Sequence, residues 1–240
     1  MKGLLNLKNR QAILFSTTFI TSFIVSKQYT DPFFIPKIFF FFFASAVFVL
    51  MTCLVYYNRK FNTKLSFSWM DITVVSFMFF SFIRILFTPG ISIDNVKFYL
   101  FLINGILYFL IKPFLFETDK KDQRLPVGTI VNILLIIALL QVFWGFLQYC
   151  DITPNLQKQF NIGGAFGNPG QYTNFITPLL SFALAVFFFS RKKNKILGLI
   201  TAVAIIAILP FTQARTAWIG ALFIVVYLAD KKFCNYSPLL

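Results

Sequence analysis

The sequence contains no histidine and few acidic residues. Of its 240 residues, none is His, eight are Asp or Glu, and three are Cys. The lack of His removes the commonest general base, the commonest pH switch and the commonest transition-metal ligand. Cys53, Cys150 and Cys234 are too scattered for a metal-ligand spacing and too few for a disulfide framework. We therefore expect any chemistry to use other side chains.

What the sequence has in excess is apolar and aromatic residues. Hydrophobic residues make up 58% of the chain, 35 residues are Phe, and only 12% are charged. Soluble proteins are typically about one quarter charged. Too little polar surface remains to coat a particle in water, so the composition excludes a soluble globule and predicts an integral membrane protein.

The apolar runs predict an all-α, polytopic membrane bundle that forms one domain over residues 1–240. A helix needs roughly 17 to 25 apolar residues to cross a bilayer. Eight ranges qualify, although Lys112-Pro113 interrupts the fourth and the first, seventh and eighth are short: 11–26, 38–57, 70–88, 98–116, 127–149, 170–190, 196–211 and 214–229. Lys8 and Arg10 flank the first run as in a signal peptide, but no small-residue cleavage pattern follows, so we expect a retained helix.

The distribution of basic residues predicts the orientation. With the N-terminus and C-terminus both in the cytoplasm, 16 of the 22 Lys and Arg residues fall on the inner side. The other six are Lys27, Lys37, Lys97, Lys158, Arg84 and Arg215. This bias follows the positive-inside rule. Because the cations are dispersed over five inner segments, they do not form the stripe that nucleic acid requires, and we expect no nucleic-acid partner.

Ionisable residues at membrane depth are costly, so they are candidates for function. Arg84 lies near the outer end of the third span, and Asp71 lies at its inner end. The two are about 20 Å apart along a helix and cannot pair within it. Two interpretations of Arg84 stay open: its side chain extends to the outer headgroups, or it belongs to a functional site.

Arg215 is the sharper candidate, because it opens the eighth span on the side where the positive-inside rule disfavours a cation. The positive end of the helix dipole is also unfavourable for a guanidinium. A phosphate or diphosphate would satisfy Arg215 through two parallel hydrogen bonds. The alternative is an interfacial anchor beside Trp218.

A glycine-rich segment on the outer side precedes the sixth span. Gly163, Gly164, Gly167 and Gly170 allow close backbone approach, and Pro169 restricts Asn168 to extended geometry before a helix. The segment is either a tight re-entry turn or part of a site. Polar residues follow on one face of span six (Asn174, Thr177, Pro178, Ser181) and of span five (Gln141, Trp144, Gly145, Gln148). The amides suit sugar hydroxyls, but hydrogen bonding between helices is the favoured interpretation.

Two motifs in this order resemble those of the bacterial O-antigen ligase and polymerase-like membrane family. They are Gly-Ala-Phe-Gly-Asn-Pro-Gly at 164–170 and Thr-Gln-Ala-Arg-Thr-Ala-Trp at 212–218. The family typically has Gly-x-Phe-Gly-Asn-Pro-Asn and, at the head of a later span, Thr-x-Ser-Arg-Gly. The resemblance covers residues 161–230, and Gly170 and Ala214 depart from the family pattern.

The resemblance implies an enzyme of the bacterial inner membrane that acts at its periplasmic face. Such an enzyme transfers a glycan from undecaprenyl diphosphate to lipid A core, a protein or a growing chain. Arg215 would match the family's motif arginine, and Phe166, Gly167, Asn168 and Pro169 its outer loop. Gln213 and Asn174 would lie beside them, and Arg84 is a possible second diphosphate contact. No metal or other cofactor is expected, since the outward carboxylates Asp31, Asp94 and Asp151 fall in separate loops or loop edges.

Family members continue into further spans and a periplasmic loop with a His thought to act in transfer. We therefore expect the 240 residues to be either the front of a longer protein or a truncated product that binds the carrier without transferring it. No catalytic residue can be named. Two other classes stay open: a small transporter or flippase component with a path along spans five and six, and a fragment with only a structural role.

Overall fold

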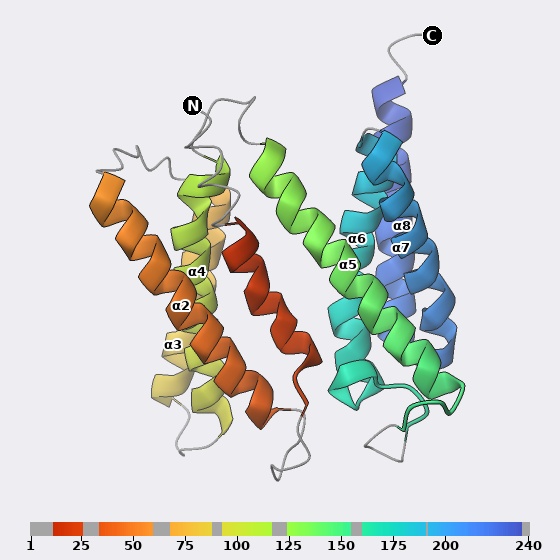
Figure 1. The fold of residues 1–240 in the computed structure, drawn as a ribbon, viewed down its shortest axis with the longest axis horizontal. Coiled ribbons are helices and arrows are strands. Elements are labelled where there is room, and N and C mark those ends of the chain that lie inside the picture. The colour runs from red at the N-terminus through yellow and green to blue at the C-terminus, as the bar shows by residue number, and fades with distance from the viewer. Residues whose placement is uncertain are drawn as a thin grey trace. The chain divides into compact units, whose positions relative to one another are not determined.

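The computed structural model describes residues 12–25, 34–59, 68–87, 93–116, 124–154, 160–190 and 192–236 (Figure 1). Within these ranges the chain is helical and forms no strand, which confirms the all-α class. A helical segment over Ala12–Phe23 ends in the 3-10 helix η1 (Thr17–Phe23). The remaining elements are α2 (Ile35–Arg59), α3 (Trp69–Phe87), α4 (Ile93–Phe116), α5 (Arg124–Tyr149), η2 (Gly164–Phe166), α6 (Pro169–Phe189), α7 (Lys192–Ile208), η3 (Leu209–Thr212) and α8 (Arg215–Tyr236).

Each of the eight predicted ranges overlaps a helical segment. Four segments are long and apolar enough to cross a membrane: Ile35–Leu54, Val127–Tyr149, Pro169–Phe189 and Asn194–Thr212. Ala12–Phe23, Trp69–Ile83 and Tyr99–Lys112 are apolar but shorter. The chain is therefore that of a membrane protein, whereas the count of eight spans and the cytoplasmic location of both termini stay predictions.

Several helix ends differ from the apolar runs because capping and proline chemistry, not hydropathy alone, set them. Lys112-Pro113 interrupts the apolar run but not the helix, since α4 continues to Phe116. Asp94 and Lys97, expected in or beside an outer loop, lie within α4. The seventh range ends as an α-helix at Ile208, and Pro210 then lies in η3. Helix α8 extends past the predicted residue 229 to Tyr236.

The described helices fall into two compact units. Unit 1 comprises Met1–Thr18 and Phe42–Thr129, and unit 2 comprises Phe19–Phe41 and Ile130–Leu240. In unit 1, α3 packs against α4. In unit 2, α6 packs against both α7 and α8. The single membrane domain predicted over residues 1–240 stays a prediction.

Close approach of α6 and α7 depends on Gly198. A methyl group at this position would lie 2.7 Å from the Ala183 carbonyl oxygen and 2.8 Å from the Phe187 nitrogen. Small residues that let helix backbones meet are the usual contact between membrane helices, because lipid offers no hydrophobic drive for their association. The α6–α7 pair is thus held by backbone proximity.

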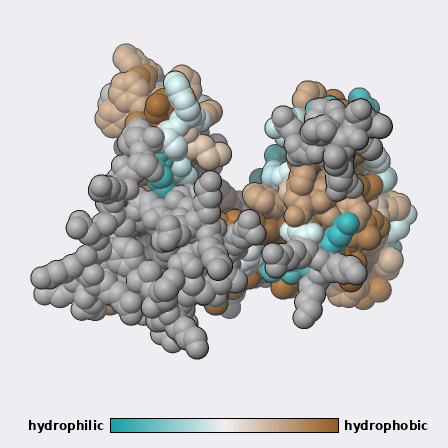
Figure 2. Space-filling view, turned by 90° about the horizontal axis from the view of Figure 1, so that it is seen from above, coloured by the Kyte–Doolittle hydropathy of each residue, from teal (hydrophilic) through white to brown (hydrophobic). Residues whose placement is uncertain are grey.

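Many large apolar side chains point away from the helices. Phe43, Phe79, Phe80, Phe87 and Phe223 are each more than 60% exposed. Figure 2 shows brown, hydrophobic side chains on the visible surface of the described helices. Such a surface is unfavourable in water and suits contact with lipid.

Candidate functional site

The glycine-rich segment of unit 2 is fixed by the side-chain amide of Gln148, in the last turn of α5. The Gln148 Oε1 accepts hydrogen bonds from the backbone nitrogens of Gly163 (3.0 Å) and Gly164 (2.8 Å), and its Nε2 donates to the Gly164 carbonyl (3.1 Å). Gln148 is 4% exposed. A buried backbone group without a partner is costly, so this one amide makes a non-helical turn possible at the end of the helix.

A second amide, Gln141, lies two turns earlier on the same face of α5. Its Oε1 accepts from the Ala165 nitrogen at 3.4 Å, and its Nε2 donates to the Ser22 carbonyl at 3.1 Å. Tyr172 of α6 donates its hydroxyl to the Gln141 carbonyl at 3.1 Å and is fully buried. These contacts connect α5, α6, η1 and the turn into one buried polar network.

The structure thus assigns the amides of span five to the polypeptide itself. The sequence left sugar binding and interhelical hydrogen bonding open; Gln141 bonds Ser22 of η1, as the favoured interpretation expects, whereas Gln148 bonds the backbone of the turn instead. Gly145 lies on the same face, where the Tyr172 ring takes the space that a side chain would need. This part of the predicted polar face is a scaffold for the turn.

Gly164 and Gly167 have backbone angles that favour glycine. Their φ values are +54° and +72°. Gly164 is also packed against the Tyr172 ring and the Gln141 amide, and Gly167 forms the left-handed cap that ends η2. A β-carbon in the left-handed region adds strain, so the spacing of these two glycines fixes the shape of the turn.

Asn168 and Pro169 start α6. Asn168 is extended (φ −118°, ψ 128°) and its Oδ1 accepts from the Gly170 nitrogen at 2.8 Å. Pro169 occupies the first helical turn, where its missing N–H costs nothing. The predicted extended geometry of Asn168 before a helix is confirmed, and Asn168 is half-buried while Gly167 is buried.

Lys37 contributes a cation to the same turn. It lies in the first turn of α2, within unit 2, and its Nζ donates to the Ala165 carbonyl. The ammonium also lies 4.4 Å from the centre of the Phe166 ring. The positive-inside rule places Lys37 among the outer basic residues but predicts no contact for it. No spacing rule could have paired it with a residue 128 positions away.

Arg215 begins α8 with its side chain exposed. Gln213, also exposed, adopts a left-handed conformation (φ +55°) that closes η3 and directs the chain into α8. Thr212 supports the turn, since its hydroxyl donates to the Leu209 carbonyl at 2.7 Å. The Arg215 guanidinium has no hydrogen-bond or ion-pair partner among the residues that the structure describes.

The two motifs lie at the same end of unit 2. The ring of Phe211 in η3 packs at a tilt against Tyr149, the last residue of α5, with ring centres 4.4 Å apart, and η3 contacts α6. In Figure 1 the end of α5 and the starts of α6 and α8 all lie at the bottom of the view. A polar turn, two helix N-termini and an exposed guanidinium are therefore collected on one end of the unit.

The remaining predicted site residues are less gathered. Asn174 is exposed on α6, whereas Thr177 is buried, faces Gly220 of α8, and has a hydroxyl with no partner in the described part of the chain. The predicted polar face of span six is thus divided between surface and helix contact. The side chain of Arg84 lies outside the described residues, so its role stays a prediction.

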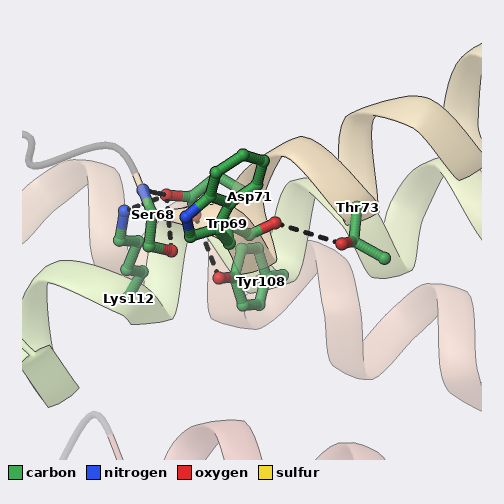
Figure 3. Close-up of polar contacts among 6 residues, drawn as sticks. All are labelled: Ser68, Trp69, Asp71, Thr73, Tyr108 and Lys112. Carbon is green, nitrogen blue, oxygen red and sulfur yellow. Dashed lines mark hydrogen bonds and ion pairs between the residues drawn. The ribbon is translucent and has the colours of Figure 1, made fainter.

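The structure also shows a buried ion pair in unit 1 that the sequence analysis missed (Figure 3). Lys112 Nζ lies 2.7 Å from Asp71 Oδ2, and the two side chains are 5% and 0% exposed. Tyr108 donates its hydroxyl to Asp71 Oδ1 at 3.0 Å, and Ser68 donates both its nitrogen and its hydroxyl to Oδ2. Three donors thus share Oδ2, and one donor reaches Oδ1.

A signal for half of this cluster was present in the sequence. Ser68-Trp-Met-Asp71 before an apolar run is the Ser-x-x-acid signature of a helix N-terminus. That signature explains why α3 begins at Trp69. It does not identify Lys112, because the pairing requires α3 and α4 to lie side by side, with the start of α3 beside the last turns of α4.

No protein-family model, no curated protein and no solved structure matches this chain. Among the described residues, no three His, Cys, Asp or Glu side chains gather in a way that could hold a metal ion. The arrangement available for chemistry is therefore a cationic, hydrogen-bonding end of unit 2, which suits recognition of an anion.

Proposed function

We propose that the chain is an O-antigen-ligase-like protein of the bacterial inner membrane that binds an undecaprenyl-diphosphate-linked glycan at its periplasmic face. All eight helical segments would cross the membrane, with both termini in the cytoplasm. The end of unit 2 that carries Arg215 and the 163–170 turn would then face the periplasm. The function served would be assembly of lipopolysaccharide or another surface polysaccharide.

The observation that carries the proposal is the exposed guanidinium of Arg215, which lies at the same end of unit 2 as the 163–170 turn. An arginine can form two parallel, charge-assisted hydrogen bonds with a diphosphate, which a neutral lipid cannot accept. The N-terminus of α8 adds backbone N–H groups that favour an anion. The exposed Gln213 and Asn174 would offer donors and acceptors to the diphosphate or to the first sugars.

The proposal is tested by binding of undecaprenyl diphosphate to the purified 240-residue chain in detergent. Charge-assisted hydrogen bonds are worth about 1.5 to 3 kcal/mol each, so the loss of both in Arg215→Ala should weaken binding by roughly a hundredfold or more. Arg215→Lys should retain part of the affinity, because it keeps the charge but not the paired donors. Undecaprenol, which lacks the diphosphate, should bind the native chain and Arg215→Ala equally weakly.

The matched control is Lys195→Ala. Lys195 lies in the first turn of α7, which starts at the opposite end of unit 2 from Arg215 (Figure 1). The Lys195 ammonium lies over the Phe187 ring. Its removal lowers the net charge by the same amount and should leave diphosphate binding unchanged. Equal affinity of native protein and Arg215→Ala would refute the assignment of the site, as would an equal loss in Lys195→Ala.

A further inference from the structure

A second candidate site lies in unit 1 and is independent of the diphosphate proposal except that both place the helices in a membrane. A groove of about 340 Å³ runs along the seam between α3 and α4. It is lined by Thr73, Val74, Phe77, Phe101, Asn104, Gly105 and Tyr108. Pockets that hold small molecules begin at about this size.

The polar atoms along the groove are directed elsewhere. Thr73 donates its hydroxyl to the Trp69 carbonyl at 3.0 Å, and the Asn104 amide nitrogen donates to the Leu100 carbonyl at 2.8 Å. Tyr108 donates its hydroxyl to Asp71 (Figure 3). These three side chains therefore present mainly carbon to the groove, so a sugar or nucleotide would gain few hydrogen bonds there. The expected occupant is a hydrocarbon.

The position of the groove fits one acyl chain of a lipid that enters from one leaflet of the bilayer. Thr73 and Phe77 lie about 6 and 12 Å from the start of α3 at a rise of 1.5 Å per residue. The Asp71–Lys112 pair lies at the same end of the seam as that helix start. Phe77 and Tyr99 are more than half exposed, so the surroundings of the groove are themselves apolar. The groove is thus reached from the lipid, near the end where α3 begins.

The charge of the sequence before α3 selects the kind of lipid. Residues 59–68 include Arg59, Lys60 and Lys64 and no carboxylate. Basic clusters next to the end of a membrane helix attract anionic headgroups, at about 1 kcal/mol per cation. We propose that the α3–α4 groove binds one acyl chain of an anionic phospholipid from the leaflet at the Asp71–Lys112 end.

The probe is phosphatidylglycerol with a photoactivatable diazirine on one acyl chain, incorporated at low fraction into phosphatidylcholine vesicles that contain the full chain. After irradiation, labelled peptides are mapped by mass spectrometry. Label should concentrate on the groove segments 73–77 and 101–108. A phosphatidylcholine probe with the same diazirine should label these segments less than the anionic probe does.

Asn104→Phe is the groove-filling variant, and Ile106→Phe is its matched control on the same helix. Both positions are exposed, but only Asn104 lines the groove. Asn104→Phe should lose most of the groove label, while Ile106→Phe should keep it. Thr73→Phe provides a second filling variant from α3, with Val75→Phe as its control.

Three results would overturn the proposal. Label spread evenly over the exposed rings of α3, such as Phe79 and Phe80, would show only the general lipid surroundings. Equal labelling by both headgroups would remove the preference for an anionic lipid. Displacement of the phospholipid label by undecaprenyl phosphate would assign the groove to an isoprenoid chain instead. Because Arg215 takes no part in this experiment, its result leaves the diphosphate test unaffected.

Discussion

Asp71 and Lys112 illustrate what a membrane interior demands of single residues. Either charge alone would be buried without an ionic partner, whereas in the pair the Asp71 carboxylate accepts from Lys112 and also from Tyr108 and Ser68. Replacing a buried ion pair by apolar groups is often neutral, but removing one partner typically costs about 3 to 5 kcal/mol. The pair therefore connects α3 to α4 in a way that depends on both members.

We expect Lys112→Met to lower the free energy of unfolding clearly more than a surface substitution does, because it leaves the Asp71 carboxylate without its cation. Asp71→Asn combined with Lys112→Met should recover much of this loss. Unfolding by SDS titration in mixed micelles measures both. Lys195→Met, which removes a cation that makes no ion pair in the described residues, is the control; a loss in Lys112→Met no larger than in this control would contradict the prediction.

At the level of elements, the turn between α5 and α6 depends on one side chain. Gln148 holds the nitrogens of both Gly163 and Gly164. We expect Gln148→Leu to accelerate hydrogen exchange at these two amides about tenfold or more, since each lost hydrogen bond is worth roughly 0.5 to 1.5 kcal/mol. Amides in the middle of α5 should exchange as before.

The control for the turn is Gln171→Leu, which makes the same chemical change at an exposed position in α6. If Gly163 and Gly164 exchange at native rates in Gln148→Leu, the amide does not hold the turn. If Gln171→Leu accelerates them equally, the effect belongs to α6 as a whole.

Two glycines in helices should respond to alanine with opposite signs. Gly198 has no room for a methyl group between Ala183 and Phe187, while a methyl group on Gly128 meets nothing within 4 Å. Gly198→Ala should therefore lower the free energy of unfolding by about 1 to 3 kcal/mol through overpacking. Gly128→Ala should raise it by up to about 1 kcal/mol through helix propensity. A Gly198→Ala variant as stable as the native chain in SDS titration would refute the close approach of α6 and α7.

Sequence reasoning located the helices better than their contacts, and the reason is physical. Hydropathy identifies the apolar segments that can form membrane helices. For this reason α5 and α6 begin and end within three residues of the predicted ranges. Partners such as Lys112 for Asp71, or Lys37 for Ala165, depend on which helices become neighbours. Gln141 and Gln148 were recognised as one polar face, but only the folded turn shows what that face binds. Arg215 is predicted from its charge and its position alone, and its role stays a prediction.

At the scale of the whole molecule, the native cysteines provide a test of the span count. Cys150 directly follows α5 and is exposed, and Cys234 lies near the end of α8. Three helices, α6, α7 and α8, separate them. If all three cross the membrane, the two thiols lie on opposite sides, with Cys150 in the periplasm under the positive-inside rule.

A membrane-impermeant maleimide applied to intact spheroplasts should therefore label Cys150, and should label Cys234 only after the membrane is permeabilised. Cys53 lies within α2 at lipid depth and should stay unlabelled. A Cys53→Ala variant removes any contribution of this thiol to the label on the other two. Labelling of Cys150 and Cys234 from the same side would mean that either one or all three of α6, α7 and α8 do not cross. Labelling of Cys234 alone from outside would reverse the orientation, and it would place Arg215 and the 163–170 turn in the cytoplasm, where a periplasmic glycan carrier cannot reach them.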